Sequence, residues 1–105
     1  MQFTQEQKNQ YLDKLALSTQ QGMWLTDMAM MKSEEKLSKK RALLTVLEQQ
    51  LENKEFKSAK EGKAQIKFVT DEIADLEAEI QESKLLIETG RIDLEMIEEY
   101  RGKPV

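Results

Sequence analysis

A heptad repeat runs through the second half of the chain and constrains its fold more than any other feature. Apolar or small residues return at alternating steps of four and three: Gly62, Ile66, Val69, Ile73, Leu76, Ile80, Ser83, Ile87, Gly90, Leu94 and Ile97. A stripe that recurs about every 3.5 residues is typical of a helix that buries one side against a partner helix. The repeat therefore predicts a helix over residues 63–100 that packs as part of a coiled coil.

The preceding segment carries a matching stripe. It has apolar residues seven positions apart: Met23, Met30, Leu37, Leu44 and Leu51. This spacing predicts a helix over residues 23–57, followed by a turn over residues 58–62. Because long helices joined by a short connection pack antiparallel, the two segments are expected to form a hairpin.

The position of the turn sets which residues of the two helices are expected to face each other. Folding about residue 59 places Leu51 near Val69 and Met23 near Ile97. The segment from Lys32 to Lys67 has a net charge of +4, and the segment from Asp71 to Glu99 has a net charge of −9. These opposite charges favour pairing of the two segments, although exposed ion pairs add only about 0.2–1 kcal/mol each.

A shorter helix is expected before the hairpin. Thr4 and Gln7 fit a capping box, which predicts a helix start at residue 5. Gly22, after a run of polar residues, is the strongest break signal in this half, so this first helix is predicted over residues 5–20. The predicted fold is all-α: an antiparallel, coiled-coil-like hairpin with an additional N-terminal helix at its open end, in a single domain over residues 1–105.

The amino-acid composition argues against several classes of functional site. The chain has no Cys and no His, and 34% of its residues are charged. It therefore lacks thiolate nucleophiles, the usual zinc ligands and the side chain that titrates near neutral pH. We expect no enzymatic activity, no metal and no cofactor.

Targeting signals are also weak. The polar N-terminus gives no indication of a secretory signal. The longest apolar-rich run, Met23–Met31, is about half the length that spans a bilayer. We expect no membrane insertion and a cytoplasmic protein, although export without a leader stays open.

The same run is apolar on nearly all sides of its helix, which exceeds what one partner helix covers. Further apolar residues lie off the seam near the end of the chain. Together they are the predicted partner-binding surface: Met23, Trp24, Met28, Met31, Leu85, Ile92 and Met96. The partner is a protein of unknown identity, and a second copy of the chain is expected to form a homodimer. The alternative interpretation is that these side chains form the core at the base of the helical bundle.

Two charged clusters suggest other functions. The first could mimic nucleic acid and occupy the basic groove of a target enzyme: Glu72, Asp75, Glu77, Glu79 and Glu82. Its simpler interpretation is a solvated face paired with the basic segment. The second, around the hairpin tip, could contact phosphates: Lys54, Lys57, Lys60, Lys63 and Lys67. Interleaved glutamates and a net charge of −4 for the chain argue against nucleic-acid binding.

The sequence thus leaves three functional hypotheses. The first is a protein-interaction module, such as an adaptor, an assembly factor or a chaperone-like spacer, that acts through an apolar helical surface. The second is a small inhibitor that uses the acidic helix. The third is a nucleic-acid binder that uses the tip lysines.

Overall fold

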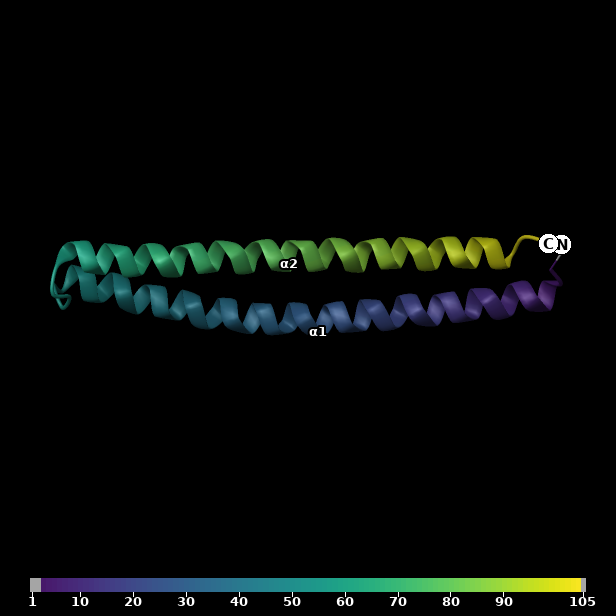
Figure 1. The fold of residues 1–105 in the computed structure, drawn as a ribbon, viewed down its shortest axis with the longest axis horizontal. Coiled ribbons are helices and arrows are strands. Elements are labelled where there is room, and N and C mark those ends of the chain that lie inside the picture. The colour runs from purple at the N-terminus through teal and green to yellow at the C-terminus, as the bar shows by residue number, and fades with distance from the viewer. Residues whose placement is uncertain (1–2, 105) are drawn as a thin grey trace. The chain divides into compact units, whose positions relative to one another are not determined.

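The computed structural model describes residues 3–104, and its described part consists of two helices. Helix α1 spans Gln5–Glu52 and helix α2 spans Ala59–Arg101, with residues 53–58 forming the turn between them (Figure 1). No strand occurs in residues 3–104. The predicted all-α hairpin is confirmed.

Local hydrogen bonds explain where each helix begins. At α1, the amide of Gln7 donates to Thr4 Oγ1 at 3.1 Å, and the amide of Thr4 donates to Gln7 Oε1 at 3.0 Å. This reciprocal pair confirms the predicted capping box. At α2, the amide of Glu61 donates to Ser58 Oγ at 3.2 Å, so Ser58 is the N-cap.

The separate N-terminal helix is not found. Residues Gln5–Glu52 form one helix of 48 residues that continues through Gly22. A glycine inside a helix costs only about 1 kcal/mol relative to alanine. The seam rows continue on both sides of Gly22, with Leu12 buried and Met23 half-buried, so packing outweighs this cost.

The turn lies earlier in the chain than the sequence suggested. Helix α1 ends at Glu52 rather than at residue 57, and α2 begins at Ala59 rather than at residue 63. Lys54 has a left-handed backbone with a φ of 57°, which reverses the chain just after the end of α1. The Ser58–Glu61 capping signal then starts α2 inside the segment that was predicted as turn.

The shifted turn changes the register by one heptad. A Cβ atom at Gly62 would lie 2.9 Å from Leu51 Cδ1, and a Cβ atom at Gly90 would lie 2.5 Å from Met23 Cγ. Leu51 therefore faces Gly62 rather than Val69, and Met23 faces Gly90 rather than Ile97. The prediction that apolar seams meet is correct, but the predicted pairing of their layers is wrong.

The chain divides into two compact units, which are described separately. Residues 30–82 form one of them, the turn unit. The other, the terminal unit, comprises residues 3–29 and 83–104 of the described chain. The prediction of a single domain stays a prediction.

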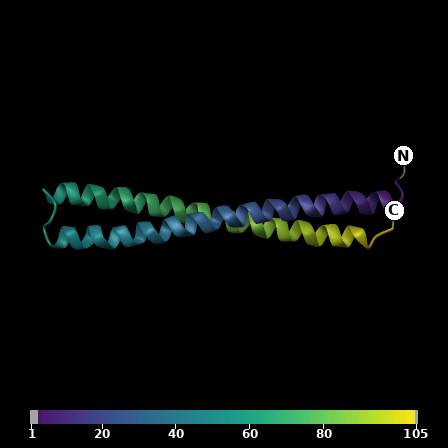
Figure 2. The same ribbon diagram turned by 90° about the horizontal axis from the view of Figure 1, so that it is seen from below.

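The turn unit has a continuous apolar core. Five buried side chains form it: Leu37, Leu47, Val69, Ile73 and Ile80. Half-buried residues pack against them: Met30, Leu44, Phe56, Ile66 and Leu76. Both views show the end of α1 and the start of α2 side by side here (Figures 1 and 2). The seam predicted from the heptad repeat is the core of this unit.

The terminal unit has a thinner core. Its buried large side chains are Leu12 on α1 and Ile97 on α2. Thr19 and Thr26 occupy two seam positions of α1, and their hydroxyls donate to the carbonyl oxygens of Leu15 and Gly22 at 3.0 and 2.9 Å. These bonds satisfy the hydroxyls, but the seam holds less apolar surface than in the turn unit.

Among the described residues, neither helix contains a stretch that is both long enough and apolar enough to cross a membrane.

Candidate interaction surfaces

Exposed large hydrophobic side chains concentrate in the terminal unit. Of the sixteen in the described chain, twelve belong to this unit. They are Phe3, Tyr11, Leu15, Leu17, Trp24, Leu25, Met28, Leu85, Leu86, Ile92, Met96 and Tyr100. Scattered exposed apolar residues are normal, but contiguous ones mark interaction sites. The arrangement of these twelve therefore decides what the unit can bind.

One set lies on α1 on the side away from α2. Residues three and four apart share a helix face, so Leu17, Gln21, Trp24 and Met28 form one row, here named the Trp24 row. Trp24 is 63% exposed and Met28 is 40% exposed. The seam takes the other side of the helix through Thr19, Met23 and Thr26, so the Trp24 row points away from the neighbouring helix.

Helix α2 has a similar outward row. Leu85 is 67% exposed, and Ile92 follows it two helical turns later at 45% exposure. At the border between this row and the adjoining face of α2, the Thr89 hydroxyl donates to the Leu85 carbonyl oxygen at 2.9 Å. This bond satisfies the hydroxyl within the helix, so the row presents a mainly apolar surface.

A broader surface, named the groove face, combines rows from both helices. On α1 the row is Tyr11, Leu15, Ser18, Gly22, Leu25 and Ala29, and on α2 it is Leu86, Thr89, Asp93, Met96 and Tyr100. A hollow of about 260 Å³ lies between the rows, lined by Leu12, Leu15, Thr19, Asp93, Met96, Ile97 and Tyr100. Both helices therefore contribute to one shallow apolar groove.

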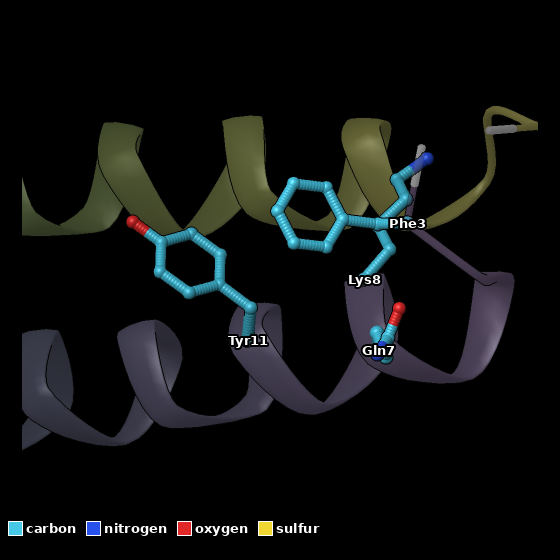
Figure 3. A pocket seen from close by; sticks show the side chains of 4 residues that line it. All are labelled: Phe3, Gln7, Lys8 and Tyr11. Carbon is cyan, nitrogen blue, oxygen red and sulfur yellow. The ribbon is translucent and has the colours of Figure 1, made fainter. Parts of the chain in front are cut away.

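A second hollow adjoins the start of α1. It has a volume of about 420 Å³ and is lined by Phe3, Gln7, Lys8 and Tyr11. Figure 3 shows the rings of Phe3 and Tyr11 directed into this space. Phe3 is 61% exposed and Tyr11 is 66% exposed, so their ring faces are open to a partner. The ammonium group of Lys8 donates to the carbonyl oxygen of Lys103 at the rim.

The other side of α2 is charged. Its row at the same spacing is Lys84, Glu88, Arg91, Glu95 and Glu98, here named the charged row. Arg91 pairs with both Glu88 and Glu95. The hydrogen bond from Arg91 lowers the pKa of Glu88 below its ordinary value, and the carboxylates raise the pKa of Arg91. The seam separates this row from the groove face, so these two faces of α2 differ: one is charged and the other is mainly apolar.

Another ion pair joins the two helices of the terminal unit. Arg101 Nη1 lies 2.6 Å from Asp13 Oδ1, and Arg101 Nε lies 3.3 Å from Glu98 Oε1. The hydrogen bond to Asp13 raises the pKa of Arg101. Both carboxylates are largely open to solvent, so the pairs serve alignment more than stability.

Most of the predicted partner-binding residues are accessible. Met31, in the turn unit, is 60% exposed and follows Met28 at helical spacing. Met96 is 47% exposed and lines the groove. Met23 is the exception: it is half-buried against Gly90 and belongs to the seam.

The sequence interpretation missed part of the groove face. Tyr11, Leu15, Leu86 and Tyr100 were not assigned to a partner surface. These residues also follow a spacing of three and four, which could have identified them as one helix face. On α1, however, this spacing joins them to Leu25 only if the helix continues through Gly22.

The acidic cluster is partly engaged within the turn unit. Glu72 Oε1 lies 3.2 Å from Lys40 Nζ, and Glu77 Oε1 lies 3.0 Å from Arg41 Nη2. Ser33 Oγ donates to Glu79 Oε2 at 3.3 Å. Asp75 and Glu82 are exposed. Much of this charge thus contacts α1, while its role as a nucleic-acid mimic stays a hypothesis.

The predicted tip lysines lie at the turn and on the first turns of α2, and their contact with phosphates stays a prediction. Lys54 and Lys57 border a hollow of about 300 Å³ at the turn, beside Leu51 and Phe56. Lys60 and Lys63 are exposed on the first turns of α2. Lys67 Nζ lies 2.8 Å from Asp71 Oδ2, and this hydrogen bond raises the pKa of Lys67. Phe56 is not free for base stacking, because it packs against Gly62.

Comparisons with known proteins add no name to this geometry: no protein-family model, no curated protein and no solved structure matches the chain.

Proposed function

We propose that the protein is a non-enzymatic interaction module that binds another protein through apolar side chains of its terminal unit. The observation that supports this most directly is the Trp24 row. It presents a tryptophan and a methionine to solvent on the side of α1 away from the seam. Tryptophan is enriched at the energetic centres of interfaces, and methionine adapts to differently shaped partners.

The chemistry of the row suggests the kind of partner. Leu17, Trp24 and Met28 follow the spacing of a helix that packs against another helix. We therefore expect a partner that offers an apolar helix or helical groove, bound without a charged anchor. An adaptor, an assembly factor or a chaperone-like spacer would use such a contact.

The proposal is tested by affinity capture from an extract of the source cells with quantitative mass spectrometry. Trp24→Glu and Gln21→Glu change neighbouring positions of one row, and both leave the seam intact. A partner that binds the wild type and the Gln21→Glu control, but is lost with Trp24→Glu, supports the proposal. Circular dichroism must show equal helicity in the three proteins. If every captured protein binds Trp24→Glu as well as the wild type, the proposal is wrong.

A further inference from the structure

We infer that the groove face of the terminal unit is a self-association surface, which takes the groove face of a second copy of this chain across a two-fold axis. This surface is distinct from the Trp24 row, so the inference stands independently of the proposed function. Four observations carry it: the extent of the face, its charge, its symmetry and its open glycine.

The face is large enough for a specific contact. Its six large side chains are between 41% and 66% exposed: Tyr11, Leu15, Leu25, Leu86, Met96 and Tyr100. Each side chain exposes on the order of 100 Å², so together the six present on the order of 600 Å² of apolar area. A standard interface buries roughly 800 Å² on each partner, so the face approaches that size once its polar rim is included.

Its charge also suits a second copy. Asp93 is the sole charged side chain in the two rows, while the charged row with its ion pairs lies beyond the seam. Two cations border the end of the face, where Lys8 lines a hollow with Tyr11 and Lys103 Nζ lies 5.1 Å from the centre of the Tyr100 ring. A partner with many charges would find few complementary groups along the middle of this face and would lose hydration on binding. An identical, nearly neutral apolar face meets no such cost except where the two Asp93 side chains approach each other.

The way α1 and α2 are aligned places the centres of both groove-face rows at the same level. Because Gly90 faces Met23, residue 93 on α2 lies level with residue 20 on α1. The α1 row from Tyr11 to Ala29 is centred on residue 20, and the α2 row from Leu86 to Tyr100 is centred on residue 93. A single two-fold axis perpendicular to the helices therefore bisects both rows, as an isologous contact requires.

Away from its centre, that axis pairs some large side chains with small ones and others with large ones. It places Tyr11 opposite Ala29 of the second copy and Met96 between the levels of Thr89 and Gly90. It also places Leu15 opposite Leu25 and Leu86 opposite Tyr100, so that apolar area meets apolar area there. Alternation of large and small residues across a contact lets facing helices interlock. Beside the axis, Ser18 lies opposite Gly22 of the second copy, so two small residues meet where the α1 helices cross.

Gly22 allows the close approach that this packing needs. A Cβ atom added at Gly22 would meet nothing within 4 Å, so the backbone of α1 is open at that point. The α1 helix of a second copy can therefore contact this backbone next to the axis. The result is a base of four helices in which the apolar grooves of two copies cover each other.

The primary test compares Leu86→Glu with Leu85→Glu by sedimentation equilibrium of the full chain. The two leucines are neighbours on α2 and both are exposed, but only Leu86 belongs to the groove face. We expect a wild-type dimer that dissociates at about micromolar concentration, and Leu86→Glu should raise the dissociation constant at least about tenfold. Leu85→Glu should change it by less than about threefold. A wild type that stays monomeric up to about millimolar concentration, or equal effects of the two variants, overturns the inference.

A cross-linking experiment tests the axis separately. The chain has no cysteine, so Asp93→Cys introduces a single thiol at the predicted two-fold axis. We expect this variant to form a disulfide-linked dimer under mild oxidation, and Glu88→Cys on the charged row to stay unlinked. If Asp93→Cys does not cross-link faster than Glu88→Cys, the two-fold packing is wrong even if a dimer exists. Neither experiment involves Trp24, so failure of this inference is distinguishable from failure of the proposed function.

Discussion

The turn unit and the terminal unit are built from the same two helices and the same heptad spacing, yet they treat apolar surface differently. The turn unit buries five large hydrophobic side chains and exposes four, whereas the terminal unit buries two and exposes twelve. In the turn unit the apolar residues fall on the seam. In the terminal unit the seam carries Thr19, Thr26, Ser83 and Gly90, and much of the apolar surface lies on other faces.

This difference shows that heptad spacing determines which sides of the helices meet. The composition of the other sides determines how much apolar surface stays exposed and available to a partner. Burial of apolar area is the main driving force of folding and of association. The turn unit places most of its apolar area in its own core. The terminal unit retains it at the surface, where a partner or a second copy can cover it.

The largest expected effect tests the core of the turn unit. Ile80 is 6% exposed and belongs to its apolar cluster. Ile80→Ala should lower the free energy of unfolding by about 2–5 kcal/mol, because it removes buried methyl groups and leaves a cavity. Leu85→Ala in the terminal unit should change it by less than about 0.5 kcal/mol. Urea unfolding followed by circular dichroism measures both, and equal losses would remove the contrast between the units.

The next effect concerns close packing in the terminal unit. Gly90→Leu should destabilise the protein by about 1–3 kcal/mol, because its Cβ atom would lie 2.5 Å from Met23 Cγ. Met23→Ala provides space at the same point. The double variant should therefore lose at least about 1 kcal/mol less than the sum of the single losses. Strictly additive losses would show that Met23 and Gly90 do not face each other, which would contradict the observed alignment of α1 and α2.

A smaller effect, a gain in stability, is expected from a substitution at Gly22. The site is helical and open, so Gly22→Ala should raise the free energy of unfolding by up to about 1 kcal/mol. Thermal unfolding at low protein concentration measures this without a contribution from self-association. A loss of stability would indicate a break or a left-handed backbone at Gly22, and would restore the separate N-terminal helix.

The smallest effect concerns the charged row. The hydrogen bond from Arg91 lowers the pKa of Glu88 below its ordinary value of 4.5. A carboxylate with a lowered pKa in the folded state stabilises the fold above its ordinary pKa, and this contribution is lost as the pH falls through the lowered value. Glu88→Gln should therefore reduce stability slightly at neutral pH, and the difference should vanish in strong acid. Glu99→Gln is the control for the same charge change on the same helix, and an effect of Glu88→Gln that persists in acid would contradict the assignment.

The sequence by itself determined the fold class and the seam. The row from Gly62 to Ile97 is buried or half-buried at every position, as its spacing predicted, because a 3.5-residue period leaves one side of a helix apolar wherever that helix packs. The capping box at Thr4 was equally legible, since it depends on residues three positions apart. The sequence also showed that the run around Trp24 carries more apolar surface than one seam needs, but it left open whether that surface is core or binds a partner.

Only the tertiary structure decided the position of the turn, the continuity of α1 and the faces on which the remaining apolar residues gather. A heptad repeat fixes register only to within seven residues, so sliding one helix by a heptad keeps both seams in contact. The Ser58 cap and the left-handed Lys54 choose among these registers. Gly22 is a weak local breaker, and packing on both sides of it carries the helix through. That continuity in turn places Tyr11 and Leu15 in one row with Leu25, which local sequence signals did not connect.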